Sequence, residues 1–206
     1  SQHAVIKIIF SRTAGGRGYR YDNGQGVTRI VSTHPLPVFP QQFSRQGIQV
    51  TICHLRLRLQ PRLAGIKHLN RLEQVMARAE WGEEYEEGLL LDYNSQLIEG
   101  TMSNLFLVHA GCLYTPRLNN AGVAGVMRSV ILDLASEIGL ETRVQTVTLK
   151  DLQSADEVFL CNSLIDIWPV IAVADQFKYR VGRVTQTLQH ALAVQDKTGP
   201  GIWYSE

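Results

Sequence analysis

The chain has 206 residues, of which 45% are hydrophobic and 19% charged, and its formal net charge is +1. This composition supports a substantial core and excludes an intrinsically disordered chain, and the balanced charge without a basic block argues against a nucleic-acid partner. No apolar run approaches the ~20 residues of a membrane span, and no signal peptide is recognised. Cys53, Cys112 and Cys161 each lie inside an apolar run. We expect reduced, buried thiols in a cytoplasmic protein.

The N-terminal part predicts two strands joined by a glycine-rich loop. Strands are expected at Ala4–Arg12 and at Val27–Ser32, because both segments are rich in β-branched residues. The loop over residues 13–19 carries Arg17 and Tyr19, and its G-G-R-G lacks both the dinucleotide and the Walker spacing. The loop is interpreted either as a mobile element that presents a guanidinium to an anionic substrate or as an ordinary solvated hairpin loop.

Lys67 is the candidate nucleophile. Among the five lysines of the chain it alone follows an apolar run, Leu63-Ala-Gly-Ile66, after a strand predicted at Ile48–Cys53. A lysine enclosed by apolar neighbours loses solvation of its charged form, which favours the neutral, nucleophilic amine. The alternative is an ordinary lysine at a helix start with its ammonium in water.

A helix is predicted directly after Lys67, ending near Trp81-Gly82. Its expected core face comprises the apolar residues that recur at helical spacing, namely Leu69, Leu72, Val75, Met76 and Ala79. His68, beside the lysine, is interpreted as a packed histidine rather than a base. The acidic run that follows is interpreted as a solvated turn and consists of Glu83, Glu84, Glu86 and Glu87.

Glu99 is the candidate site carboxylate. The apolar segment Gly88–Leu91 and the segment Gln96–Glu99 are predicted to form a β-hairpin. Glu99 then stands at a strand end, directly before the small-residue run Gly100-Thr-Met-Ser-Asn104. From position alone, a functional carboxylate and a surface glutamate are equally expected.

A glycine turn at residues 122–127 predicts an anion site. This turn opens a helix whose expected core face is Met127, Val130, Ile131, Leu134 and Ile138. Unpaired N–H groups and the positive dipole end at a helix N-terminus attract anions, although a plain helix start is the alternative. A later strand, Asp156–Leu160, breaks at Cys-Asn162-Ser163, which supplies short hydrogen-bonding groups. A terminal amphipathic helix is predicted around Leu188–Val194.

The order and spacing of these features resemble the fold-type IV pyridoxal-phosphate enzymes, from about Ala4 to Val173. That family includes branched-chain aminotransferases, D-amino-acid aminotransferases and 4-amino-4-deoxychorismate lyases. The runs A-G-I-K-H-L-N-R-L-E-Q and G-G-R-G-Y look like those of the lyases. The turn G-V-x-G-[IV]-M-R, Gly122–Arg128, is also similar to the lyase form, whereas the aminotransferases commonly have threonine at the position of Met127.

The resemblance implies a role for each candidate residue. Lys67 would bind pyridoxal 5'-phosphate (PLP) covalently and act as the catalytic base, and Glu99 would pair with the pyridine nitrogen. The remaining implied cofactor contacts are Val123, Gly125, Val126, Met127, Asn162 and Ser163. Arg17 and Tyr19 are the candidates for substrate binding.

The implied activity is a lyase reaction in folate biosynthesis that converts 4-amino-4-deoxychorismate to 4-aminobenzoate and pyruvate. Two alternatives stay open: a fold-type IV aminotransferase acting on branched-chain or D-amino acids, and an inactive binding module. A metal enzyme is not expected, because the six histidines are scattered and neither H-x-x-x-H nor C-x-x-C occurs.

The resemblance also implies the architecture. We expect an α/β (α+β) fold with a mixed, largely antiparallel sheet or pseudo-barrel, flanking helices, and assembly as a homodimer. Residues 1–20 are predicted to form an interdomain strand and substrate loop, and residues 21–206 the large C-terminal PLP-binding domain. Members of the family carry a further N-terminal subdomain that supplies a phosphate-binding arginine, and neither is evident in this sequence.

Overall fold

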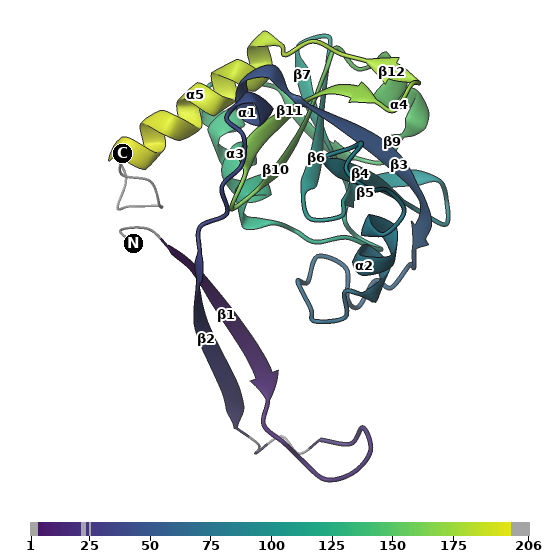
Figure 1. The fold of residues 1–206 in the computed structure, drawn as a ribbon, viewed down its shortest axis with the longest axis vertical. Coiled ribbons are helices and arrows are strands. Elements are labelled where there is room, and N and C mark those ends of the chain that lie inside the picture. The colour runs from purple at the N-terminus through teal and green to yellow at the C-terminus, as the bar shows by residue number, and fades with distance from the viewer. Residues whose placement is uncertain (1–3, 22–23, 25, 199–206) are drawn as a thin grey trace. The chain divides into compact units, whose positions relative to one another are not determined.

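The computed structural model describes residues 4–21, 24 and 26–198, and the chain divides into two compact units between Phe39 and Pro40 (Figure 1). The predicted boundary after residue 20 falls inside the first unit. In these described ranges, no helix combines the length and the apolar character needed to cross a membrane.

The first unit is an antiparallel β-hairpin. Strand β1 (Ala4–Arg12) pairs with β2 (Val27–Pro35) in an unbroken register from Ala4↔Pro35 to Arg12↔Val27. The β-branched residues of both segments favour this extended backbone. Both predicted strands are therefore confirmed, and the second runs three residues beyond its predicted end at Ser32.

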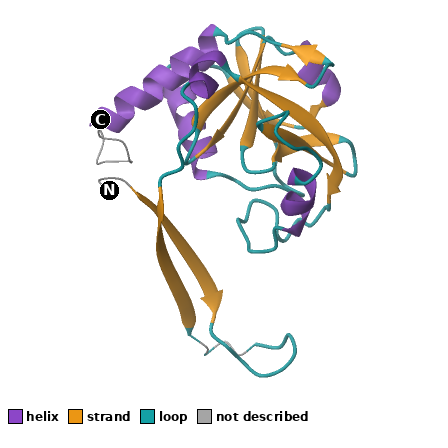
Figure 2. Ribbon diagram, in the orientation of Figure 1, coloured by secondary structure: helices purple, strands orange, loops and turns teal. Residues whose placement is uncertain are grey.

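The second unit is built on a ten-stranded sheet (Figure 2). Its strands are β3 (Ile48–Leu57), β4 (Glu87–Asp92), β5 (Gln96–Gly100), β6 (Asn104–His109), β7 (Cys112–Pro116), β8 (Thr142–Gln145), β9 (Val147–Thr148), β10 (Glu157–Asn162), β11 (Asp166–Val173) and β12 (Phe177–Lys178). The order is β8-β7-β6-β10-β11-β3-β4-β5-β9, and β12 pairs with β11. Three pairs, β11–β3, β3–β4 and β7–β8, are parallel, and the other pairs are antiparallel. The predicted mixed, largely antiparallel sheet is confirmed.

Five helices flank this sheet: α1 (Gln42–Gln46), α2 (Leu72–Arg78), α3 (Val126–Glu137), α4 (Leu149–Ser154) and α5 (Arg183–Thr198). Figure 1 shows α3 and α5 beside β10 and β11. The core beneath these two helices includes Phe106, Phe159, Ile131, Leu134 and Leu188, all buried. The rings of Phe106 and Phe159 stack with centroids 4.9 Å apart. This core fixes the N-terminal end of α3 against the sheet.

Helix α2 corrects the sequence prediction. It begins at Leu72 rather than directly after Lys67, and its predicted core face is wrong, because Leu72 and Val75 are 70% and 63% exposed. The helix is attached to the sheet by its other face. Glu73 Oε1 accepts a hydrogen bond from the backbone N–H of Arg58 in the segment after β3 (3.0 Å), and the small side chain of Ala77 is fully buried.

The three cysteines are free and buried, as predicted. Burial raises the pKa of the Cys53 thiol to about 12 and also raises that of Cys161. The solvated turn predicted for the acidic run is wrong at its last member. Glu87 is the first residue of β4 and is only 1% exposed.

Candidate active site

Glu99 lies near the end of β5 and is 4% exposed. Its Oε2 accepts a hydrogen bond from the backbone N–H of Val123 (2.8 Å), while its Oε1 has no hydrogen-bond partner among the described residues. Burial raises the pKa of Glu99 to about 7, and the Val123 bond and the charges of Arg71 and Lys67 partly oppose that rise. A buried carboxylate with one oxygen free is suited to a cationic hydrogen-bond donor.

Lys67 lies in an exposed loop, so the predicted apolar enclosure of this lysine is wrong. The neighbouring Ile66 is itself 53% exposed. The loop is held by its own backbone and by one side chain. Arg71 donates to the carbonyl of His68 from Nε (2.9 Å) and to that of Ile66 from its terminal nitrogen (3.3 Å). Because Lys67 and Arg71 both lower the pKa of Glu99, the lysine and the carboxylate belong to one electrostatic site.

Main-chain hydrogen bonds join the lysine loop to the glycine turn. Gly65 N–H donates to the carbonyl of Gly122 (2.9 Å), and Ala124 N–H donates to the carbonyl of Gly65 (3.0 Å). Gly122 has a φ of +86°, and a Cβ there would lie 2.7 Å from the Ile98 side chain. Glycine is therefore required at this position by both conformation and space. Since Val123 lies between these two bonds and also binds Glu99, the turn connects the two candidate residues.

The N-terminus of α3 is free to receive an anion. Gly125 is the N-cap and provides no side-chain cap, and the N–H groups of Val126, Met127 and Arg128 have no acceptor in the described part of the chain. A Cβ on Gly125 would lie 2.2 Å from Asn104 Oδ1, so the backbone approaches β6 closely. Unpaired N–H groups and the helix dipole together form an anion site.

Asn162 and Ser163 differ in what they offer to this site. Asn162 Oδ1 accepts from the N–H groups of Leu164 (2.7 Å) and Ile165 (3.0 Å), and its Nδ2 donates to the carbonyl of Met102 (3.0 Å). Its side chain therefore holds the turn after β10. Ser163 is exposed, and its hydroxyl has no hydrogen-bond partner among the described residues. The phosphate role of both residues stays a prediction.

Arg17 and Tyr19 lie in the loop of the first unit, and both are exposed. Neither side chain has a hydrogen bond or ion pair among the residues that the structure describes. Their assignment to the substrate stays a prediction.

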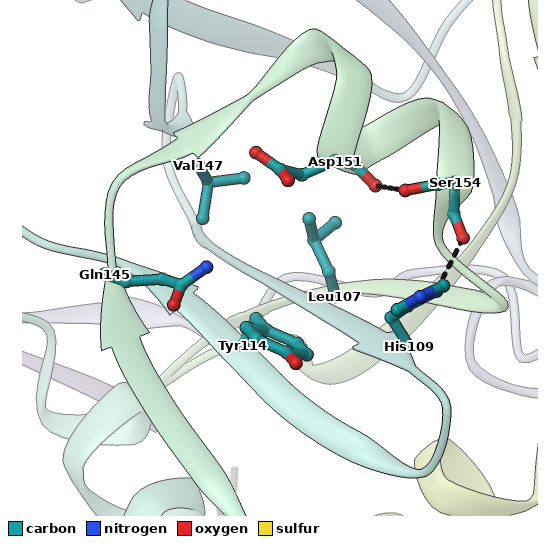
Figure 3. Close-up of a pocket in the computed structure, with 7 residues that line it drawn as sticks. All are labelled: Leu107, His109, Tyr114, Gln145, Val147, Asp151 and Ser154. Carbon is teal, nitrogen blue, oxygen red and sulfur yellow. Dashed lines mark hydrogen bonds between the residues drawn. The ribbon is translucent and has the colours of Figure 1, made fainter.

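A cleft of about 460 Å³ borders the lysine loop. His68, Arg71, Ala121 and Gly122 are among the residues that line it. A smaller cavity of about 120 Å³ lies elsewhere in the second unit, beside His109, Tyr114 and Asp151 (Figure 3). None of the predicted site residues lines the smaller cavity, so the chemistry is assigned to the side of Lys67 and Glu99.

These groups fit PLP. A buried carboxylate with one free oxygen suits a protonated ring nitrogen, the uncapped helix suits a phosphate, and Lys67 supplies the amine for an aldehyde carbon. Three supporting residues were missed by sequence reasoning: Gly65, Arg71 and Asn104, whose Nδ2 donates to the Val123 carbonyl (2.8 Å). Arg71 and Asn104 stand inside the runs H-L-N-R and E-G-T-x-S-N, which were the available signal.

The sheet and this set of groups define a cofactor-dependent enzyme site, and comparison with known proteins gives the family. Residues 1–173 match the family described as amino-transferase class IV, and the chain belongs to this family. It is 40% identical over 192 residues to the aminodeoxychorismate lyase of Vibrio harveyi, which covers 91% of this chain and 71% of that protein.

Solved structures agree with this assignment. The 4-amino-4-deoxychorismate lyase of Pseudomonas aeruginosa superposes with a TM-score of 0.89 at 45% identity, covering 94% of this chain and 71% of that one. The branched-chain aminotransferase of Thermobaculum terrenum was solved in its PLP form and shares the fold, with a TM-score of 0.77 at 22% identity over 92% of this chain and 63% of that one. Members of the family bind PLP.

Proposed function

We propose that this chain is a PLP-dependent lyase that converts 4-amino-4-deoxychorismate into 4-aminobenzoate and pyruvate. The observation that carries the proposal is the difference between two comparisons. Identity is 45% to the Pseudomonas aeruginosa lyase over 94% of the chain, but 27% to the Escherichia coli branched-chain aminotransferase over 93%. The chain spans 71% of that lyase, so the activity of this chain is itself part of the proposal.

The residues that would hold the cofactor are Lys67, Glu99 and the α3 turn. Lys67 would bind it covalently, Glu99 Oε1 would accept a hydrogen bond from the ring nitrogen, and the N–H groups of Val126 and Met127 would bind the phosphate. Bound PLP supplies an electron sink for the charge that develops at the substrate carbon. Val123 is fixed between Glu99 and Asn104 and would define one side of the ring site.

Lys67 is also the proposed general base. Its amine would remove the proton from C4 of the substrate, the bond from C3 to the enolpyruvyl oxygen would break, and the six-membered ring would become aromatic. The released enol takes up a proton and becomes pyruvate, so atoms and charge balance. An exposed loop position suits this task, because the amine must leave the cofactor and reach the substrate. General base catalysis of this kind contributes ~10²–10⁴-fold.

The charge of Glu99 fits this chemistry. Burial alone disfavours its carboxylate form, as its raised pKa of about 7 indicates. A protonated ring nitrogen would stabilise the carboxylate, and the carboxylate would in turn keep that nitrogen protonated. The buried position therefore strengthens the pairing that an electron sink requires.

The test is a product assay on the chain with added PLP. Incubation with 4-amino-4-deoxychorismate is expected to yield pyruvate and 4-aminobenzoate in equal amounts, measured by lactate dehydrogenase coupling and by chromatography. A branched-chain or D-amino acid with 2-oxoglutarate is expected to yield no new amino acid. Transamination without pyruvate release would overturn the lyase assignment in favour of an aminotransferase, and neither activity in a PLP-loaded protein would support a binding module.

The proposal extends to the assembly and the substrate contacts. We expect a homodimer by light scattering, and a monomer would contradict it. Arg17 and Tyr19 are proposed to bind the substrate. Replacing Arg17 with Gln is expected to raise KM about tenfold or more with little change in kcat, because a charge-assisted hydrogen bond to a substrate carboxylate would be lost.

A further inference from the structure

Glu87 is a buried carboxylate without a role in the chemistry above. It is the first residue of β4 and is 1% exposed. Its Oε1 accepts from the N–H groups of Gly88 and Thr101 (3.0 Å each) and from the Thr101 hydroxyl. Its Oε2 accepts from Met102 N–H (3.1 Å) and from the Ser103 hydroxyl (2.8 Å). Each of these five bonds uses the side chain as an acceptor.

Four of these bonds come from one short turn, residues 100–103, which joins β5 to β6. The turn is closed by Gly100 N–H, which donates to the Ser103 carbonyl (2.7 Å). A Cβ on Gly100 would lie 2.2 Å from Ser103 Oγ and 2.9 Å from Glu87 Oε2. The turn is thus packed against the carboxylate with no room for a side chain between them.

This turn carries three parts of the candidate site. Glu99 directly precedes it, and Asn104, which donates to the Val123 carbonyl (2.8 Å), directly follows it. Asn162 donates to the Met102 carbonyl within the turn (3.0 Å). A displacement of the turn would therefore move the ring-nitrogen partner, the Val123 support and the turn after β10 together.

We propose that Glu87 is a positioning residue for the cofactor site, which fixes the 100–103 turn so that Glu99, Asn104 and Asn162 hold the geometry that PLP requires. This role rests on the proposed function, since it assigns those neighbours to PLP. Removing an acceptor from buried donors leaves them unsatisfied, which costs about 1–3 kcal/mol for each. The negative charge of Glu87 also contributes, behind burial, to the raised pKa of Glu99.

The test compares Glu87→Gln with Glu83→Gln. Glutamine keeps the size of the side chain but turns an NH₂ group toward donors, whereas Glu83 is exposed and has no hydrogen bond among the described residues. In Glu87→Gln, the Kd for PLP is expected to rise about tenfold or more. In the cofactor-free protein, amide exchange at Thr101 and Met102 is expected to accelerate, and the pKa of Glu99, followed by carboxyl NMR, is expected to fall. The Glu83→Gln protein is expected to match the wild type.

A folded Glu87→Gln protein with wild-type PLP affinity and wild-type exchange at Thr101 and Met102 would overturn the proposal. If Glu87→Gln does not fold, Ser103→Ala removes one donor from the same carboxylate and carries the same expectation, with a smaller rise in Kd. If the wild-type chain itself does not bind PLP, the proposed function fails, and the exchange and Glu99 titration of the cofactor-free proteins still decide the role of Glu87.

Discussion

Lys67 and Glu99 belong to one site but are held in opposite ways. Glu99 stands in a buried sheet, with Leu97, Ile98 and the turn around Glu87 packed about it. Lys67 stands in an exposed loop that depends on main-chain bonds to the glycine turn and on the Arg71 clamp. The difference teaches that the electrostatic part of the site is built into the core, while the part that must move a proton is attached to it by a few identifiable bonds.

The largest expected effect concerns the mobile side of this comparison. Lys67→Ala is expected to lower the lyase rate by about 10²–10⁴ or more, because both the covalent attachment and the base are lost. Stability is expected to change little, since Lys67 is exposed. Turnover is measured by pyruvate release, with the exposed Lys150→Ala as the matched control. A Lys67→Ala protein that turns over at the wild-type rate would remove the lysine from the mechanism.

The rigid side predicts a stability effect of Glu99 that depends on pH. Its folded pKa of about 7 lies above the ordinary value of 4.5, so the cofactor-free protein is favoured below pH 4.5 and loses that contribution as the pH rises through 7. The loss is expected to reach roughly 3 kcal/mol. Urea unfolding from pH 4 to 8.5 should show it in the wild type relative to Glu99→Gln. A constant difference between the two proteins across that range would contradict the assigned pKa.

The junction between the two regions predicts an intermediate effect. Gly125→Ala places a Cβ 2.2 Å from Asn104 Oδ1, and the forced shift is expected to lower the free energy of unfolding by about 1–3 kcal/mol. Gly16→Ala, where an added Cβ has no atom within 4 Å, is the control. Thermal unfolding of the two variants measures the difference. Equal stabilities would show that the turn yields without cost.

Which parts of this comparison the sequence could predict follows from physics. The alternating and β-branched segments gave the strands, and the glycine turn gave the free N-terminus of α3, because those signals are local. The exposure of Leu72 and Val75 and the burial of Glu87 were missed, since periodicity reports an apolar face but not whether that face has a partner, and a run of glutamates reads as solvated. The five bonds to Glu87 come from non-local pairing of β4 with the turn after β5.

The smallest expected effect sharpens that lesson. Leu72→Gln is expected to change the free energy of unfolding by no more than about 0.5 kcal/mol, because the side chain is 70% exposed. Ala77→Leu, on the buried face of the same helix, is expected to cost about 1–3 kcal/mol through overpacking. Urea unfolding compares them. A Leu72→Gln cost as large as that of Ala77→Leu would restore the face that the periodicity predicted.

The central claim is that Lys67 and the Glu99 sheet form one PLP site within this chain. The most direct measurement is borohydride reduction of the PLP-treated protein, followed by peptide mass spectrometry to locate the pyridoxyl group among the five lysines. The expected result is a stoichiometric label on Lys67, with Lys7, Lys150, Lys178 and Lys197 unlabelled. A label spread over the other lysines, or absent from Lys67, would contradict the account.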